Sequence, residues 1–146
     1  MRKIIVGIDG SEQSTEALQW ALDYASPGDQ IVATHSWQLP PRSGFEFPAY
    51  NPADVEVYAN QLVERVVSET VPEDSDGPKV MISVHHGHPG RVLIDESAGA
   101  DLIVVGSRGF GGFRGLLLGS VSTYVVHHAT CPVVIMPHDG QEPDDA

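Results

Sequence analysis

Short apolar runs alternate along the chain with longer segments of helical spacing. Five runs are rich in valine and isoleucine and are bounded by glycine, proline or polar residues. They therefore predict β-strands, at residues 3–8, 30–36, 79–85, 101–106 and 131–136. The run from Leu102 to Gly106 and the run from Val133 to Met136 do not alternate between apolar and polar positions. Continuous apolarity of this kind predicts strands buried on both faces of a parallel sheet.

The four segments between these runs carry signals for helices. Their predicted starts are residues that can cap a helix, in two cases followed by proline: Ser11 or Ser14, Asn51-Pro52, His88-Pro89 and Ser120. Pro27-Gly28 ends the first segment, and the third ends near Gly99. The apolar faces expected from helical periodicity are Ala17, Leu18, Ala21, Leu22 and Ala25 in the first helix, Val55, Tyr58, Leu62 and Val66 in the second, Val92 and Leu93 in the third, and Val121, Tyr124, Val125 and His128 in the fourth.

This strict alternation predicts an α/β fold with a single open five-stranded parallel sheet, Rossmann-like, and helices on both faces. Sheets of this kind bind ligands beyond the carboxyl ends of their strands, where the strand order reverses. The loops after the first and fourth strands are therefore the expected site. We expect one domain over residues 1–138, followed by an acidic flexible tail at residues 139–146.

Composition narrows the classes of function. The chain has 146 residues, 41% of them apolar, and a net charge of −12, so its overall field disfavours nucleic acid and anionic membranes as partners. A single cysteine, Cys131, excludes an intrachain disulfide and is more simply a small buried residue than a reactive thiol. With neither a secretory signal nor an apolar stretch of about 20 residues, we expect a cytoplasmic protein.

One long connection stands out at residues 38–52. It holds four prolines and three aromatic residues, which disfavours a place in the core. A loop of this length is often a flap or a partner surface, but a plain variable insertion explains it equally well.

Charge points to the segment that follows the fourth strand. From Leu102 to His138 there is no Asp or Glu, where an even distribution would put about five, and the segment carries Arg108 and Arg114. Such a segment in an acidic protein predicts an anion pocket. A buried strand and a buried helix also need no carboxylates, but this explanation accounts less well for the loop between them.

The loop itself contains six glycines, counted from Gly106 to Gly119 inclusive, and it leads from a buried strand to a helix that is predicted to begin at Ser120. Backbone N–H groups at a helix N-terminus bind phosphate, and glycine permits close approach. Ser120 adds a hydroxyl donor, and Gly106 leaves room for a ribose. The loop lacks the G-K-[ST] of the Walker A motif, and no G-x-G-x-x-G follows the first strand. The chemistry is that of holding a nucleotide.

The spacing G-x-x-G, nine residues, then G-S runs through Gly106, Gly109, Gly119 and Ser120. This pattern resembles the ATP-binding subclass of the universal stress protein family. Similar segments occur in the same order along nearly 130 residues: Val6 to Ser11, Gly87 to Pro89, Asp101 to Gly109 and Ala129 to Met136. The resemblance also implies a fold like that of the adenine nucleotide alpha hydrolases.

The resemblance implies roles for individual residues. An aspartate that contacts the adenosine end of ATP falls on Asp9, and a backbone contact to adenine falls on Ser36. The ribose and phosphates would be held by Gly106 under the ribose and by Gly109, Gly119, Ser120 and the Val121 amide around the phosphates. Magnesium would bridge phosphate oxygens rather than occupy a protein cage. Arg108 and Arg114 are possible phosphate contacts that the motif does not fix, and Asp9 has an alternative role as a helix cap.

The resemblance further implies a homodimer that pairs along the last strand, from Pro132 to Met136, which would otherwise be an exposed apolar edge. The leading hypothesis is an ATP-binding regulatory protein of the stress response, acting as a nucleotide-dependent switch. One alternative is a slow ATPase or an enzyme that phosphorylates its own Ser120, Ser122 or Thr123. The loop has no acid to serve as a base, so turnover is expected to be slow at most.

A second alternative is a dimeric scaffold that does not use nucleotide. Metal binding by His85, His86 and His88 is disfavoured, because adjacent residues of a strand face opposite sides and no acid lies at ligand spacing in the sequence. The sequence contains no G-x-S-x-G elbow, so it offers no support for Ser-His-Asp catalysis.

Overall fold

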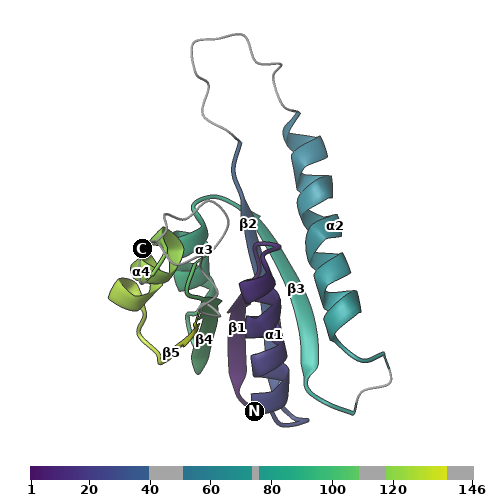
Figure 1. The fold of residues 1–146 in the computed structure, drawn as a ribbon, viewed down its shortest axis with the longest axis vertical. Helices are drawn as coiled ribbons and strands as arrows, with labels where there is room; N and C mark the ends of the chain where they lie inside the picture. The colour runs from purple at the N-terminus through teal and green to yellow at the C-terminus, as the bar shows by residue number, and fades with distance from the viewer. Residues whose placement is uncertain (40–50, 74–75, 109–117, 138–146) are drawn as a thin grey trace, which may run out of the picture.

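Strands and helices alternate strictly in the computed structural model, which describes residues 1–39, 51–73, 76–108 and 118–137 (Figure 1). The elements in chain order are β1 (Lys3–Gly7), α1 (Glu12–Tyr24), β2 (Gln30–Trp37), α2 (Pro52–Thr70), β3 (Lys79–His86), α3 (Pro89–Glu96), β4 (Leu102–Gly106), α4 (Ser120–His128) and β5 (Val133–Met136). All five predicted strands and all four predicted helices are present, with ends that differ from the predicted ones by a few residues.

The strands form one parallel sheet in the order β3-β2-β1-β4-β5. The chain moves outward from β1 through β2 to β3, then returns across the sheet to β4, so the order reverses between β1 and β4. The predicted α/β fold, with an open five-stranded parallel sheet, is confirmed. The reversal places a crevice beyond the carboxyl ends of β1 and β4, as the sequence predicted.

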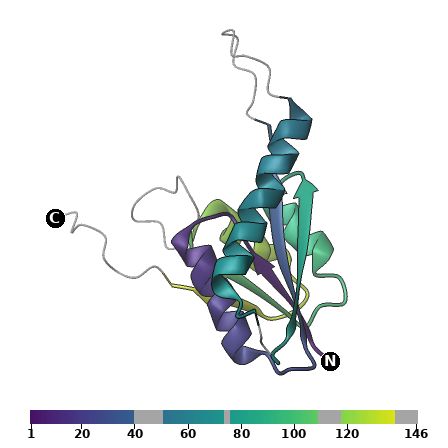
Figure 2. The same cartoon turned by 90° about the vertical axis from the view of Figure 1, so that its right-hand side faces the viewer.

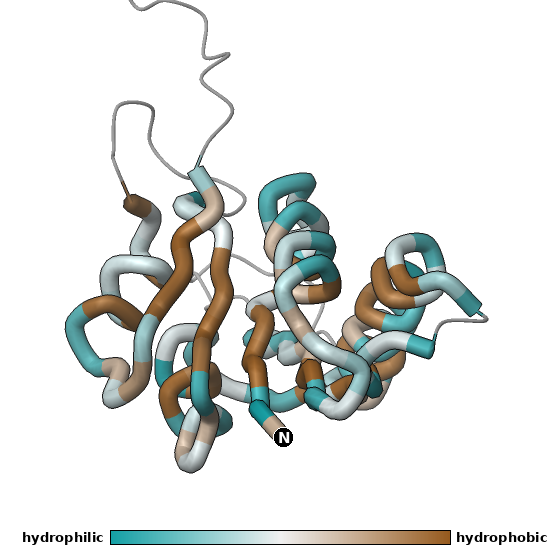
Figure 3. The backbone as a smooth tube through the Cα atoms, turned by 90° about the horizontal axis from the view of Figure 1, so that it is seen from below, coloured by the Kyte–Doolittle hydropathy of each residue, from teal (hydrophilic) through white to brown (hydrophobic). Residues whose placement is uncertain are grey.

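Helices cover both faces of the sheet (Figure 2). On one face, Leu18 of α1 and Val63 of α2 pack against Ile4 and Ala33 in one core cluster. On the other, Leu93 of α3 and Val125 of α4 pack against Ile5 in a second cluster. The residues of the central strands are accordingly mostly hydrophobic, whereas polar residues lie mainly on the outer sides of the helices (Figure 3).

The two continuously apolar strands differ in burial. β4 lies inside the sheet and its first four residues are buried, as predicted. The prediction of burial on both faces was wrong for β5, whose four residues are all half-buried. The reason is its place at the edge of the sheet, where only β4 pairs with it.

The face that α2 buries differs in part from the predicted one. The fully buried residues are Ala59, Val63 and Val66, and of the predicted face only Val66 is among them, while Leu62 is half-buried and packs against the core. Tyr58 is 66% exposed. The amino-terminal turns of α2 project past the carboxyl ends of the strands (Figures 1 and 2), so this part of the helix has no sheet beneath it.

The predicted caps are largely present. Ser11, Asn51 and His88 are the N-caps of α1, α2 and α3, and each side chain accepts a hydrogen bond from a backbone N–H of its helix. α4 begins at Ser120 as predicted, but its N-cap is Gly119, which provides no side-chain cap. Two predicted helix ends were too late. α1 ends before Ala25, which is its C-cap, and α3 ends at Glu96, with Ser97 as the C-cap ahead of Gly99 at φ +76°.

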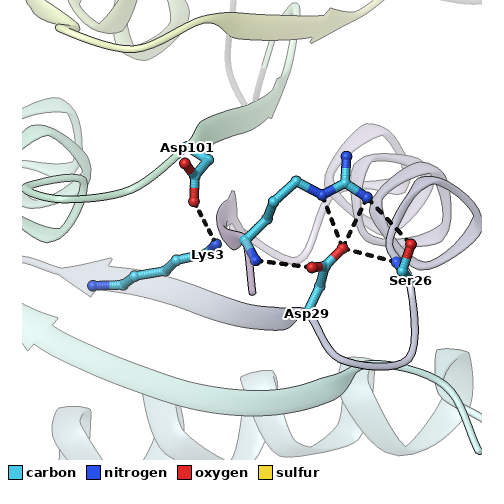
Figure 4. A network of polar contacts seen from close by, with 5 residues as sticks. Lys3, Ser26, Asp29 and Asp101 are labelled. Carbon is cyan, nitrogen blue, oxygen red and sulfur yellow. Dashed lines mark hydrogen bonds and ion pairs between the residues drawn. The ribbon is translucent and has the colours of Figure 1, made fainter.

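A polar network closes the amino-terminal end of the sheet, opposite the crevice (Figure 4). The carboxylate of Asp29 accepts hydrogen bonds from the backbone N–H groups of Arg2 and Ser26, both at 2.8 Å, and forms an ion pair with the Arg2 guanidinium, also at 2.8 Å. These donors lower the pKa of Asp29 to about 2. Asp101 accepts from the backbone N–H of Lys3 at 2.9 Å, which joins the starts of β1 and β4.

Parts of the sequence analysis lie outside the described residues. They are Gly109 and Arg114 of the loop, residues 40–50 of the connection at 38–52, and the tail at 139–146. None of the helices in the described ranges is long and apolar enough to cross a membrane.

Candidate functional site

A cavity of about 330 Å³ opens at the carboxyl ends of β1 and β4. This size falls in the lower part of the range of small-ligand pockets. Its described lining comes from four places: the loop after β1 with the first turn of α1, the end of β2, residues 89–93 of α3, and the end of β4 with the start of α4. Seven predicted site residues line it together, namely Asp9, Ser36, Gly106, Arg108, Gly119, Ser120 and Val121.

Asp9 begins a tight hydrogen-bonded turn that leads into α1. Its Oδ1 accepts from the backbone N–H of Ser11 at 2.8 Å, and its own N–H donates to the Ser14 hydroxyl at 3.3 Å. Ser11, not Asp9, is the N-cap of the helix. The carboxylate thus orders the turn through one oxygen. Among the described residues, the second oxygen, Oδ2, makes no hydrogen bond, which leaves it available to a ligand.

The end of β2 forms the next wall. The Thr34 carbonyl accepts from the N–H of Ile8 at 2.8 Å, after which β1 no longer runs beside β2. Because backbone groups of alternate residues face the same side of a strand, the N–H and C=O of Ser36 point to the side that β1 has left. The Ser36 hydroxyl itself donates to the carbonyl of Gly87. Ser36 thus offers the crevice backbone groups rather than its side chain.

The start of α4 forms the opposite wall. Gly119 gives no side-chain cap, and the first turn of the helix contains no acidic residue. The first N–H groups of a helix have no partner within it, so this N-terminus presents backbone donors and a positive dipole end to the cavity. Ser120 is exposed there, whereas Ser122 is buried, with its hydroxyl donating to the carbonyl of Ser107 at 2.8 Å. This arrangement is suited to an anion.

Gly106 is a glycine for a reason that sequence analysis did not give. A Cβ at Gly106 would lie 2.9 Å from Cβ of Gln13, so glycine here allows α1 to approach the end of β4. Close packing of α1 therefore requires glycine at position 106, in addition to the predicted need for room beside a ribose. Two residues later, the backbone N–H of Arg108 donates to Oε1 of Gln13 at 2.9 Å.

Sequence reasoning missed several residues of the site. The apolar wall comes from Pro89, Val92 and Leu93 of α3, although the predicted helix start at His88-Pro89 lay in the right place. His35 also lines the cavity, and its Nδ1 donates to the carbonyl of Ile8 at 2.7 Å. The signal that could have found these residues is the topology, because β2 and α3 both end or begin at the edge where the crevice opens.

The histidines of β3 lie on opposite faces, as predicted. His86 packs against the Trp37 ring, with 4.4 Å between ring centroids, whereas His85 pairs with Glu96 of α3. The sequence spacing did not reveal Glu96 as a partner, because it lies 11 residues after His85 and only the packing of α3 brings the two side chains together. No cluster of three or more potential metal ligands occurs within the described ranges. Cys131 is half-buried, and burial together with the nearby Asp101 raises the pKa of its thiol.

Comparison with known proteins identifies relatives of this chain. The profile of the universal stress protein family matches residues 1–137. Universal stress protein Rv2005c of Mycobacterium tuberculosis is 39% identical over 141 residues, which cover 90% of this chain and 44% of the relative. The chain therefore spans less than half of the length of this relative.

Solved structures share the fold. A universal stress protein family protein from Arabidopsis thaliana, At3g01520, with AMP bound has a TM-score of 0.61 at 22% identity, covering 99% of this chain and 98% of that one. A universal stress protein in complex with cAMP has a TM-score of 0.57 at 23% identity, covering 92% and 94%. Together, the match of the profile along the sheet and its helices and the similarity in sequence to Rv2005c show that this chain belongs to the universal stress protein family.

Proposed function

We propose that this chain binds an adenine nucleotide, with ATP as the leading ligand, in the cavity between β1 and β4. One observation carries the proposal. A single cavity brings together the Asp9 carboxylate on one side and the uncapped N-terminus of α4 on the other. A nucleotide needs this combination, because its ribose hydroxyls are hydrogen-bond donors and its phosphates are anions.

The adenosine end would lie toward β1 and β2. Oδ2 of Asp9 can accept from a ribose hydroxyl while Oδ1 continues to order the turn through Ser11. The backbone N–H and C=O of Ser36 can pair with the edge of a purine, which carries both acceptors and a donor. The apolar side chains of Val92 and Leu93 provide a surface for the base. Two proteins of the same fold support an adenine ligand, since one has AMP bound and the other is in complex with cAMP.

The phosphates would lie at the start of α4, near Gly119, Ser120 and the Val121 amide. Among the described residues that line the cavity, Arg108 is the only arginine or lysine and Asp9 the only carboxylate. A magnesium ion would therefore take its ligands mainly from phosphate oxygens and water, which is usual for nucleotide-bound Mg²⁺. Gly109 and Arg114 complete the proposed phosphate contacts from the loop.

The proposed role is that of a cytoplasmic regulatory protein in the stress response, which changes partner affinity with its nucleotide state. Residues 1–138 would be the nucleotide-binding domain, followed by the acidic tail. The edge position of β5 supports a homodimer that pairs along residues 132–136. Fast phosphoryl transfer is not expected, because Asp9 is the only carboxylate among the described residues of the lining and is assigned to the ribose, while His35, also in the lining, is bonded through Nδ1 to the Ile8 carbonyl beside β1 and β2. Ser122 is also a poor phosphoryl acceptor, since its hydroxyl is buried.

Thermal unfolding of nucleotide-stripped protein with Mg-ATP tests the proposal. A ligand at 100 times its Kd adds about 2.7 kcal/mol, which corresponds to a rise in Tm of about 5 to 15 °C for a domain of this size. Ser120→Asp places a negative charge at the proposed phosphate position, and should abolish the rise while leaving the fold intact, because an acid is favourable at a helix N-terminus. Thr123→Asp is the matched control, since Thr123 is exposed on the same helix and does not line the cavity.

Each other result supports a different function. A rise that Ser120→Asp and Thr123→Asp reduce equally would move the ligand away from this cavity. Absence of a rise with ATP, ADP, AMP or cAMP would favour the scaffold hypothesis. ATP turnover above about 1 s⁻¹, or phosphate on Ser120 or Thr123 found by mass spectrometry after incubation with ATP, would favour the enzymatic alternative.

A further inference from the structure

Gln13 lies in the first turn of α1, and α1 packs over β1 and β4. This places Gln13 beside the carboxyl end of β4 although the two are more than 90 residues apart in sequence. Gly106, which has no side chain, allows the approach, since a Cβ there would lie 2.9 Å from Gln13 Cβ. Gln13 is not among the residues that line the cavity.

The side-chain carbonyl of Gln13 accepts two hydrogen bonds from the segment that leaves β4. The Ser107 hydroxyl donates to Oε1 at 3.2 Å, and the backbone N–H of Arg108 donates to the same atom at 2.9 Å. Packing of α1 against the sheet requires neither of these hydrogen bonds, and an apolar side chain at position 13 would serve it. An amide oxygen that accepts from a backbone N–H instead fixes the path of the backbone after β4.

Ser107 carries the connection on to α4. Its backbone carbonyl accepts from the N–H of Gly119 at 2.6 Å and from the hydroxyl of Ser122 at 2.8 Å, and its own N–H donates to the Met136 carbonyl at 2.8 Å. Ser107 is 4% exposed. One buried residue is thus held by α1, β5 and α4 at once. The path from Gln13 through Ser107 to Gly119 joins the two walls of the cavity.

We propose that Gln13 is a positioning residue for phosphate recognition, which fixes Ser107 and Arg108 and, through them, the uncapped start of α4 relative to the Asp9 turn. This inference rests on the proposed nucleotide site. It assigns Gln13 to the phosphate half of the ligand and not to the nucleoside half, because both of its bonds go to the segment after β4. Loss of the amide oxygen therefore weakens phosphate-bearing ligands selectively.

The test compares Gln13→Met, which keeps length and helix propensity but removes the acceptor, with Gln19→Met as the matched control. Gln19 is on the same helix, exposed, and bonded only to Asp23 among the described residues. Calorimetric titration should show the Kd for ATP rising about tenfold in Gln13→Met and the Kd for adenosine changing less than twofold, as expected for the loss of one or two hydrogen bonds. Gln19→Met should change neither.

A second measurement, on ligand-free protein, reads the proposed bonds directly. Hydrogen exchange of the Arg108 amide should speed up about tenfold in Gln13→Met and stay near the wild-type rate in Gln13→Glu, whose carboxylate keeps the acceptor. A uniform loss of stability would instead speed up amides throughout the core.

Two outcomes overturn the inference while the proposed function stands: equal changes in the Kd for ATP and adenosine, or an Arg108 amide that is indifferent to Gln13→Met. Wild-type protein that binds neither ligand would overturn the proposed function and this inference with it. Should Gln13→Met fail to fold, a similar failure in Gln13→Glu would also contradict a role that resides in the acceptor.

Discussion

Gly90 of α3 lies against the ring of Tyr124 of α4, so closely that a Cβ on Gly90 would lie 2.7 Å from Cδ1 and 3.0 Å from Cβ of Tyr124. Two helices can approach this closely only where one of them lacks a side chain. The contact holds the start of α3, which lines the cavity, against α4, whose N-terminus is the proposed phosphate site.

We predict that Gly90→Ala destabilises the protein, although at an ordinary helical position alanine is more stabilising than glycine by about 0.5–1 kcal/mol. Overpacking against the base of the Tyr124 side chain, which cannot swing away, should outweigh that gain and leave a net loss of about 1–2 kcal/mol in the free energy of unfolding. Urea unfolding measures this change. Gly28→Ala is the control, since a Cβ there meets no atom of the described residues within 4 Å, and the prediction is wrong if Gly90→Ala is the more stable of the two.

The buried face of α2 gives the second prediction. Val63 is fully buried, whereas Tyr58, on the same helix, is 66% exposed. Val63→Ala removes two methyl groups from the core and should cost about 2 kcal/mol of unfolding free energy, while Tyr58→Ala should cost less than about 0.5 kcal/mol. Chemical denaturation of both variants compares them. A larger loss of unfolding free energy for Tyr58→Ala than for Val63→Ala would show that α2 buries the face that the sequence pattern predicted.

The difference on α2 shows where sequence analysis reaches its limit. Periodicity correctly predicted a helix after Asn51-Pro52, because capping and spacing are local properties. Its buried face depends on how far the helix extends past the sheet, which no local pattern encodes. β5 is a similar case, since an apolar run of four residues reads the same in the middle of a sheet and at its edge.

In the candidate site, too, local features could be predicted from the sequence, whereas contacts that depend on tertiary packing could not. The positions of Asp9, Gly106 and Gly119 around one crevice could be predicted, because strand alternation implies the topology and motifs mark its loops. The bonds of Gln13 to Ser107 and Arg108 could not, because they join segments that only the packing of α1 over β4 brings together. The pairing of His85 with Glu96 was missed for the same reason.

The third prediction concerns acid stability. The folded-state pKa of Asp29 is about 2, below its ordinary value of 3.8, because two backbone N–H groups and the Arg2 guanidinium favour the charged carboxylate. A carboxylate with a lowered pKa stabilises the fold fully above its unfolded pKa, and this contribution is lost as the pH falls from about 3.8 through about 2. Asp29→Asn should therefore be less stable than wild type at pH 6, with a gap that narrows between pH 4 and pH 2.

Urea midpoints at a series of pH values measure that gap. Asp23→Asn is the control, because Asp23 is exposed and accepts only from the Gln19 side chain among the described residues. A gap between wild type and Asp29→Asn that stays constant down to pH 2 would show that the Asp29 charge contributes nothing.

The last prediction tests the proposed dimer at β5. The carbonyl of Pro132 accepts from the N–H of Ile103 in β4, and the carbonyl of Met136 accepts from the N–H of Ser107 just after β4. The even-numbered residues therefore face β4, and the backbone of Ile135 faces away from the sheet. Ile135→Pro therefore removes an outward N–H without breaking the β4–β5 ladder, and proline is tolerated on an edge strand in this orientation. Sedimentation equilibrium should show at least tenfold weaker association for Ile135→Pro than for Ile135→Ala, which loses more of the side chain but keeps the N–H. Equal association of the two variants would mean that the dimer does not pair through this backbone edge, and a monomeric wild-type protein would contradict the dimer itself.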